Sequence, residues 1–182
     1  MENGDNFGHD HKMFRLLPPC LAAICLCSCA SAPPPKTAAS VDLARYAGDW
    51  YEVESSPNPF QRGCTNTRAS YTALPDGKIA VVNSCLRKGR PASIKGVARV
   101  VKGSNNAKLR VRFFWPFEGD YWIIAVDPDY RWAAVGHPNR KYQWILARTP
   151  TLDAPTLQRI RAAMAAQGFD VNLLRPTPQT NP

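Results

Sequence analysis

Cysteine and histidine are the residue types in this chain that could supply a nucleophile and a base. The 182 residues include six cysteines and three histidines. A thiol nucleophile such as Cys64 needs a neighbouring base, but His9 and His11 precede a predicted cleavage point and His137 stands alone in a predicted loop. The sequence contains no typical spacing of metal ligands and no phosphate-binding glycine loop. We therefore predict a protein that is not an enzyme and uses no metal or cofactor, with a reactive Cys64 as the enzymatic alternative.

The first 28 residues are typical of an export signal. Met13-Phe14-Arg15 precedes an apolar run from Leu16 to Ile24, which is the order of charge and hydrophobicity in a signal peptide, and the run is too short to span a bilayer. It is followed by Leu26-Cys27-Ser28-Cys29, which resembles the cleavage site of bacterial lipoproteins, where the last cysteine becomes the acylated N-terminus. We expect lipidation at Cys29, and ordinary signal-peptide cleavage a few residues later is the alternative.

The segment that follows differs in composition from the rest of the chain. Residues 29–40 are rich in proline, alanine and serine, which favours a stiff, extended tether. We expect one folded domain over residues 41–175 and a disordered tail over residues 176–182. The net charge of +9 and the pI of about 9.5 favour anionic partners such as a membrane surface. Nucleic acid is disfavoured because the basic residues alternate with apolar ones along the strands and the chain is predicted to be exported.

Short segments with a two-residue period dominate the domain. The clearest is Lys108 to Phe113, where basic and apolar residues alternate and Leu109, Val111 and Phe113 share one face. Turn residues such as Pro75-Asp76-Gly77 separate the segments. The pattern predicts an all-β fold, an eight-stranded antiparallel up-and-down barrel. The expected strands are residues 50–56, 66–73, 78–85, 93–101, 108–114, 121–127, 131–136 and 142–148, after a short turn at 41–46.

The period changes after Pro150. Asp153-Ala154-Pro155 is a helix start, and apolar residues then follow at helical spacing until Gly168. Both faces of the last strand are apolar, so we expect this one C-terminal helix to cover it from outside the barrel. The segment from Phe169 to Leu174 is expected to add a short edge strand.

Three ordered motifs identify the domain with a known family. They are Gly48-Asp49-Trp50-Tyr51-Glu52, the strand Tyr121 to Asp127, and Trp144 to Pro150 before the helix. Together they resemble the lipocalin family, in particular its bacterial outer-membrane lipoproteins and apolipoprotein D. The resemblance covers almost all of residues 41–175, although Val126 stands where the family usually has a threonine. It implies structural roles for Gly48, Trp50, Asp127 and Arg148, with the Arg148 guanidinium stacked on the Trp50 indole at the closed end of the barrel.

The interior of such a barrel holds one small ligand. Alternation along the strands points nine side chains inward, and the resemblance implies contact between the matching positions and an apolar ligand. These residues are Tyr71, Val81, Asn83, Leu109, Val111, Phe113, Tyr121, Trp144 and Leu146. The same side chains could instead fill a narrow barrel completely. Alternation also places Glu52 and Glu54 on the Trp50 face, and the sequence leaves open whether they point inward or form ion pairs.

Loops after the odd-numbered strands meet at the barrel mouth. They carry basic and aromatic residues that suit an anionic head group or an anionic bilayer surface, although solvated loop charges are an equally good explanation. The residues are Phe60, Arg62, Arg87, Lys88, Arg90, Trp115, Phe117, Arg140 and Lys141. Cys64 and Cys85 come close at this end through the 75–77 hairpin, and export favours a disulfide between them.

The signal and the resemblance together predict a lipid-binding outer-membrane lipoprotein of a Gram-negative bacterium, anchored through Cys29 and facing the periplasm. Its predicted ligand is a fatty acid or lysophospholipid, held in the barrel for storage or transport in the cell envelope. The expected partners are that lipid and the membrane, and the sequence leaves a homodimer open. The alternatives are a lipocalin-fold enzyme with a Cys64 thiol and a structural envelope module with a filled barrel.

Overall fold

The structure is a computed structural model that describes Met1 and residues 33–180. The predicted signal peptide and Cys29 lie outside these residues. In the described part of the chain, no helix combines the length and the hydrophobicity that crossing a membrane requires.

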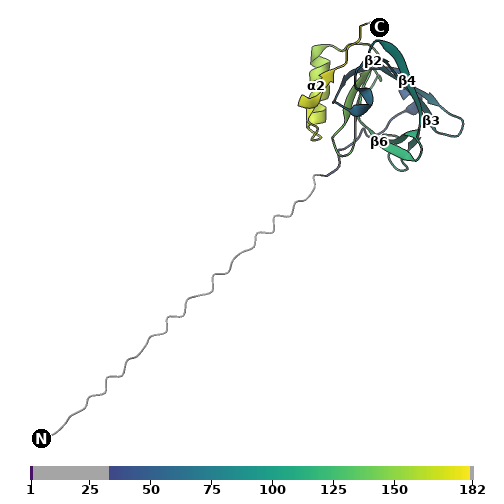
Figure 1. The fold of residues 1–182 in the computed structure, drawn as a ribbon. Helices are drawn as coiled ribbons and strands as arrows, with labels where there is room; N and C mark the ends of the chain where they lie inside the picture. The colour runs from purple at the N-terminus through teal and green to yellow at the C-terminus, as the bar shows by residue number, and fades with distance from the viewer. Residues whose placement is uncertain (2–32, 181–182) are drawn as a thin grey trace. The chain divides into compact units, whose positions relative to one another are not determined.

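Eight antiparallel strands form a closed barrel, as the sequence predicts (Figure 1). Each strand pairs with the next along the chain, and β1 closes the barrel by pairing with both β2 and β8. The strands are β1 (Gly48–Ser55), β2 (Cys64–Ala73), β3 (Ile79–Arg87), β4 (Arg90–Val100), β5 (Lys108–Phe114), β6 (Phe117–Val126), β7 (Trp132–Gly136) and β8 (Gln143–Ala147). The helix α1 (Leu43–Tyr46) precedes β1, and the 3-10 turn η1 (Pro59–Gln61) follows it.

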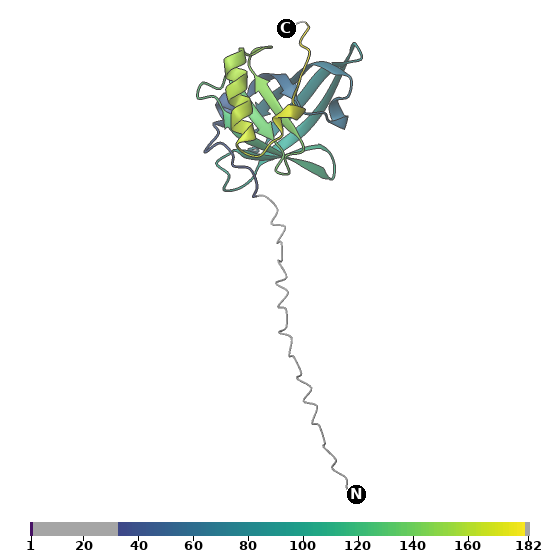
Figure 2. The same cartoon turned by 90° about the vertical axis from the view of Figure 1, so that its left-hand side faces the viewer.

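The helix α2 (Ala154–Ala165) packs against the outside of the barrel (Figures 1 and 2). Asp153 caps it by accepting a hydrogen bond from the Thr156 backbone N–H at 2.8 Å, and a proline occupies the first turn. Ile160 and Met164, one turn apart, are fully buried against Ile145 of β8 and its neighbours. The apolar outer face of the last strand is therefore covered by the predicted helix.

The segment after α2 differs from the sequence-based prediction. Residues 169–174 contain the 3-10 turn η2 (Val171–Leu173), because the Asp170 side chain accepts a hydrogen bond from the Asn172 N–H and bends the chain. The short strand comes later, as β9 (Arg175–Pro176), which pairs with β1. Residues up to Thr180, predicted as a disordered tail, make backbone hydrogen bonds to β1 and β2, such as Thr177 N–H to Val53 C=O at 2.9 Å.

The predicted tether also differs in its second half. From Pro33 onward the chain lies against the barrel and α2 instead of extending away from them. The backbone N–H of Lys36 donates to the Gln167 side chain, and that of Ala38 donates to the Ile123 carbonyl, each at 2.9 Å. These bonds fix residues 33–40 because extended backbone next to a strand finds carbonyl acceptors there.

Candidate functional site

The closed end of the barrel is built around Trp50 and Arg148. The Arg148 guanidinium lies 3.8 Å from the centroid of the Trp50 ring, which is the stacking expected from the sequence. It also donates to the carbonyls of Asp49 at 2.7 Å, Arg45 at 2.7 Å and Ala47 at 2.8 Å. Burial lowers the pKa of Arg148. One cation therefore satisfies the carbonyls that would otherwise be unpaired where the chain crosses the barrel base.

Three tyrosines lie above this base. The hydroxyls of Tyr46 and Tyr71 contact the Tyr121 hydroxyl at 2.7 and 2.8 Å, and the Trp50 indole N–H donates to the Tyr46 carbonyl at 2.8 Å. Burial raises the pKa of Tyr71 to about 12 and those of Tyr46 and Tyr121 well above their ordinary value. The hydroxyls are therefore neutral at physiological pH and act only as hydrogen-bonding groups.

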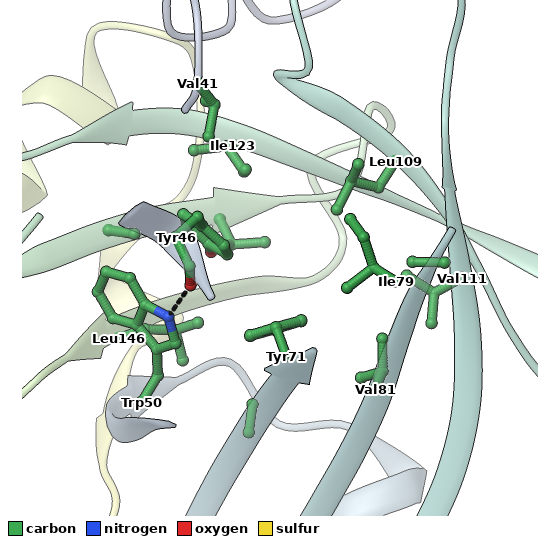
Figure 3. Packing of buried hydrophobic residues seen from close by; sticks show 14 of the residues in the cluster. Val41, Tyr46, Trp50, Tyr71, Ile79, Val81, Leu109, Val111, Ile123 and Leu146 are labelled. Carbon is green, nitrogen blue, oxygen red and sulfur yellow. Dashed lines mark hydrogen bonds between the residues drawn. The ribbon is translucent and has the colours of Figure 1, made fainter. Parts of the chain in front are cut away.

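The lower half of the interior is packed with apolar side chains. Figure 3 shows Val81 of β3, Leu109 and Val111 of β5, and Leu146 of β8 in the same buried cluster as Tyr46. Leu109 is 0% exposed and Val81 is 2% exposed. A small cavity of about 190 Å³ remains near α1 and the β2–β3 hairpin. Leu109 and Val111 were predicted to line a ligand cavity, and the structure places both in this packed cluster.

The inward-facing side chains nearer the mouth are less buried than those near the base. Along the inward face of β3, Ile79 and Val81 are buried, Asn83 and Cys85 are half-buried, and Arg87 is exposed. The other predicted interior residues divide in the same way. Tyr71 and Leu146 are buried, and Phe113, Tyr121 and Trp144 are half-buried. Exposure therefore increases toward the mouth, as expected of a cup that is closed at one end.

Aromatic side chains are exposed at the mouth. The β5–β6 hairpin presents Phe114, Trp115 and Phe117, which are 68%, 81% and 77% exposed, and Phe60 of η1 is 68% exposed. Phe60, Trp115 and Phe117 were predicted at this end, whereas Phe114 was not. An isolated exposed aromatic residue is common, but the three in the β5–β6 hairpin form an apolar cluster at the mouth.

The basic mouth residues differ in whether their side chains contact other parts of the protein. Arg62, Lys88 and Arg90 are exposed. Arg87 donates to the Phe60 carbonyl at 2.7 Å, and the Lys141 ammonium lies 5.8 Å from the Tyr142 ring centroid. Arg140 instead donates to the Gln167 carbonyl at 2.7 Å and to that of Pro33, so it holds the N-terminal segment and α2 to the barrel. Its predicted role at the mouth is therefore replaced by a structural one.

The predicted disulfide between Cys64 and Cys85 is present, with 5.6 Å between the two Cα atoms. It joins β2 to β3 near the mouth, where the register of the two strands shifts between Thr65 and Arg68. The bond therefore ties together two strands at the point where their ladder is interrupted. In this form Cys64 has no free thiol.

A bulge in β1 separates the two glutamates that alternation had placed together. The register between β1 and β8 shifts between Glu52 and Glu54. Glu52 remains in the wall near the interior, where Gln61 and Thr177 donate to its carboxylate. Glu54 lies under α2 and accepts a bidentate pair from Arg161 at 2.6 and 2.9 Å. The expectation that both share the Trp50 face is wrong for Glu54.

Two interior residues escaped the sequence-based prediction. Tyr46 was expected only in a short turn, yet it is buried in the barrel base. Gln61 reaches back from η1, accepting a hydrogen bond from the Trp144 indole at 3.1 Å and donating to Glu52. The Asn58 side chain, which accepts from the Gln61 backbone N–H at 3.0 Å, is the signal for this turn. Among residues 33–180, no group of three or more histidine, cysteine or acidic side chains could hold a metal ion.

The comparison with known families agrees with this geometry. The family model of the lipocalin-like domain matches residues 41–179. The chain belongs to the lipocalin family. It is 37% identical to the outer membrane lipoprotein Blc of Escherichia coli (strain K12) over 166 residues, which cover 88% of this chain and 94% of that protein. It is 33% identical to apolipoprotein D of Macaca fascicularis over 156 residues, which cover 81% of this chain and 82% of that protein.

Among solved structures, insecticyanin from the tobacco hornworm Manduca sexta is similar in fold. The TM-score is 0.65 at 20% sequence identity, over 80% of this chain and 84% of that one. At this identity the likeness supports the lipocalin fold alone. Lipocalins are in general binding proteins, so the less buried upper interior is the candidate binding site.

Proposed function

We propose that this protein carries a fatty acid or lysophospholipid in the upper half of its barrel, for storage or transport in the cell envelope. The observation that carries the proposal is the gradient of exposure along the inner wall, from buried Val81 to half-buried Asn83. Half-buried Phe113 and Trp144 offer apolar surface to an acyl chain, while the packed cluster around Leu109 forms the floor. Each Å² of apolar surface that the lipid buries contributes about 25 cal/mol.

The mouth supplies groups for the lipid head. Arg62, Lys88 and Arg90 are exposed there and can pair with a phosphate or carboxylate. Phe114, Trp115 and Phe117 extend from the same rim and suit the interface of a bilayer, where aromatic rings are favoured. A lipid could thus pass between membrane and barrel without its chain crossing open water.

Membrane attachment belongs to the same proposal. We place the protein in the outer membrane of a Gram-negative bacterium, facing the periplasm, with acyl chains on Cys29; the name of its relative Blc describes an outer membrane lipoprotein. Residues 33–40 lie on the barrel, so four steps of about 3.8 Å, or about 15 Å, are the longest span from Cys29 to Pro33. Because Arg140 of the β7–β8 loop binds Pro33, the segment that carries the proposed anchor joins the described part of the chain next to this loop.

Native mass spectrometry of protein purified from its own membrane tests the carrier function. We expect a co-purified species with the mass of a fatty acid or lysophospholipid, and its loss in the variant Asn83→Trp. A barrel that takes up no lipid, even when lysophospholipid is added, would instead favour a structural envelope module.

Lipidation is tested separately. Cys29→Ala should yield protein that is uncleaved or soluble, since acyl chains contribute about 0.8 kcal/mol for each buried methylene. A variant that still fractionates as an acylated membrane protein would refute the anchor. The enzymatic alternative requires a free thiol at Cys64, whereas Cys64 is bonded to Cys85.

A further inference from the structure

A second recess lies beside the mouth, away from the predicted acyl-chain site. Its volume is about 420 Å³, and it is bounded by the end of β1, the η1 segment and the C-terminal segment around Thr177. None of the nine predicted interior residues lines it. Its lining is instead polar and charged at several points, including Glu52, Arg62, Thr67 and Arg175.

The recess sits where β1 and β2 separate. The two strands pair only from Gly48 to Tyr51. Beyond that point Gln179 bridges the gap, since its side-chain N–H groups donate to the carbonyls of Glu52 at 2.9 Å and Thr67 at 3.2 Å. Gln179 therefore joins the backbones of Glu52 and Thr67 at one seam in the barrel wall, and both residues line the recess.

Glu52 lacks a cationic partner. Glu52 is 4% exposed, and its carboxylate accepts hydrogen bonds from the Thr177 hydroxyl at 2.7 Å and from the Gln61 side chain. None of the ion pairs formed by residues 33–180 includes it. Glu54, two residues away and equally buried, is paired with Arg161. A buried carboxylate without a cation is costly, so the site favours a ligand that carries one.

Two further oxygen atoms at the seam lack partners. Thr67 is 6% exposed, and its hydroxyl makes no hydrogen bond to any described residue. The side-chain carbonyl of Gln179 is likewise buried and has no partner within the described part of the protein. Of these residues, Thr67 lines the recess together with Glu52, and the two offer acceptors to a donor held there. A primary ammonium has three N–H donors, whereas a trimethylammonium group has none.

One side chain, that of Gln61, separates the recess from the predicted acyl-chain site. Gln61 contacts Glu52 on the recess side and the Trp144 indole on the interior side. Arg62 and Arg175 line the same recess and are exposed, so a phosphate next to the ammonium would find cations there.

We infer that this recess binds the primary ammonium of a phosphoethanolamine head group, carried by a lysophospholipid whose acyl chain lies in the barrel. The inference rests on the proposed function. The carboxylate of Glu52 and the hydroxyl of Thr67 accept the ammonium protons, and the two arginines contact the phosphate.

The test compares two lysophospholipids that share one acyl chain and a net charge of zero. Lysophosphatidylethanolamine and lysophosphatidylcholine differ only in the methylation of the amine, and each is titrated below its micelle-forming concentration by calorimetry. We expect the ethanolamine lipid to bind about tenfold more tightly, as for a few additional hydrogen bonds to a charged group.

Variants locate that preference. Glu52→Gln should remove it while both lipids still bind, and Thr67→Val should reduce it. Asp49→Asn is the matched control, because it removes one exposed carboxylate from the same strand without touching the recess, and it should keep the preference. Thermal unfolding checks that each variant folds. If Glu52→Gln does not fold, the lipid preference of Thr67→Val alone shows whether the recess binds the ammonium.

The outcomes separate this inference from the proposed function. Equal affinity of the unaltered protein for the two lipids overturns the ammonium site and leaves the carrier function standing. Failure to bind either lipid overturns the carrier function for lysophospholipids itself. Free phosphoethanolamine is the third ligand: we expect it to bind at least about 100-fold more weakly than the lipid, since it buries no chain. If it binds as tightly as the lipid, the recess serves a soluble amine and the lipid head-group inference is wrong.

Discussion

The two ends of the barrel are stabilised in different ways. At the closed end, Trp50, Arg148 and Tyr46 are held by stacking, and their polar atoms are paired inside the protein. At the mouth, aromatic side chains are exposed and a disulfide joins β2 to β3. A buried base can hold the fold while the rim and upper interior remain free to contact a ligand. Stability and binding should therefore respond to different substitutions.

The largest expected effect is at the closed end. Trp50→Ala removes a fully buried indole together with its stacking on Arg148, and should lower the free energy of unfolding by about 3–5 kcal/mol. Chemical denaturation measures it. Trp115→Ala at the mouth is the matched control, because its side chain is 81% exposed and its removal should change stability by less than about 0.5 kcal/mol. Equal losses at the two ends would contradict the comparison.

The disulfide is the next largest contribution, and it belongs to the mouth. Cys64 and Cys85 are 21 residues apart, so removing their bond should cost about 3 kcal/mol by the loop-entropy estimate. Replacing both residues with alanine and measuring denaturation tests this. A reducing agent should then have no further effect on the double variant. Peptide mapping of the unreduced protein should show the Cys64–Cys85 link, and two free thiols would revive the enzymatic alternative.

A third pair of substitutions locates the boundary between packed base and open cup. Leu109→Trp adds volume to a residue that is 0% exposed, so it should destabilise the barrel by about 1–3 kcal/mol. Asn83→Trp adds volume at a half-buried residue nearer the mouth. This variant should keep the fold intact and block lipid uptake. Calorimetry with a lysophospholipid and a thermal melt distinguish the two. If both variants unfold, the upper interior is solid core as well.

Much of this architecture could be predicted from the sequence. Alternating residues such as those from Lys108 to Phe113 fix a strand and its inward face, because the side-chain period of a strand is two. The stacking of Arg148 on Trp50 was predicted from two family motifs, one in the first strand of the barrel and one in the last. The helix after Pro150 was predicted from its cap and apolar spacing.

The errors came from features that alternation does not describe. The bulge between Glu52 and Glu54 adds a residue to one strand and reverses the face on which the later residues of that strand lie. Leu109 faces inward as predicted, but how far the core fills the barrel depends on side chains from all strands together. Residues 33–40 and 176–180 were predicted as part of a tether and of a tail because proline-rich composition favours a chain that does not pack, whereas their backbone groups bond to the rest of the protein. Gln61 reaches the interior because of the turn η1, and the sequence-based prediction did not use the signal for that turn, Asn58.

The smallest predicted effect lies in the turn between β6 and β7, next to the base. Asp127 is 4% exposed and accepts hydrogen bonds from the Arg131 guanidinium at 2.8 and 3.1 Å and from the backbone of Asp129 and Arg131. These bonds, first that from the Arg131 side chain, lower the pKa of Asp127 below its ordinary value. A carboxyl whose pKa is lower in the folded state stabilises the fold above the unfolded pKa of about 4, and this contribution is lost as the pH falls through the folded pKa.

Asp127→Asn should therefore cost about 1 kcal/mol near pH 7, a small value because Arg131 is 71% exposed and solvent screens the pair. The difference from the unaltered protein should shrink as the pH falls from about 4, the unfolded pKa, through the lower pKa at which the native carboxyl takes up its proton. Urea denaturation between pH 3 and pH 7 measures both curves. Asp129→Asn removes a 73% exposed carboxylate two residues away and should change stability at pH 7 by less than about 0.5 kcal/mol. A difference between Asp127→Asn and the unaltered protein that stays constant down to pH 3 would mean that Asp127 acts through shape alone and that its charge contributes nothing to the closed end.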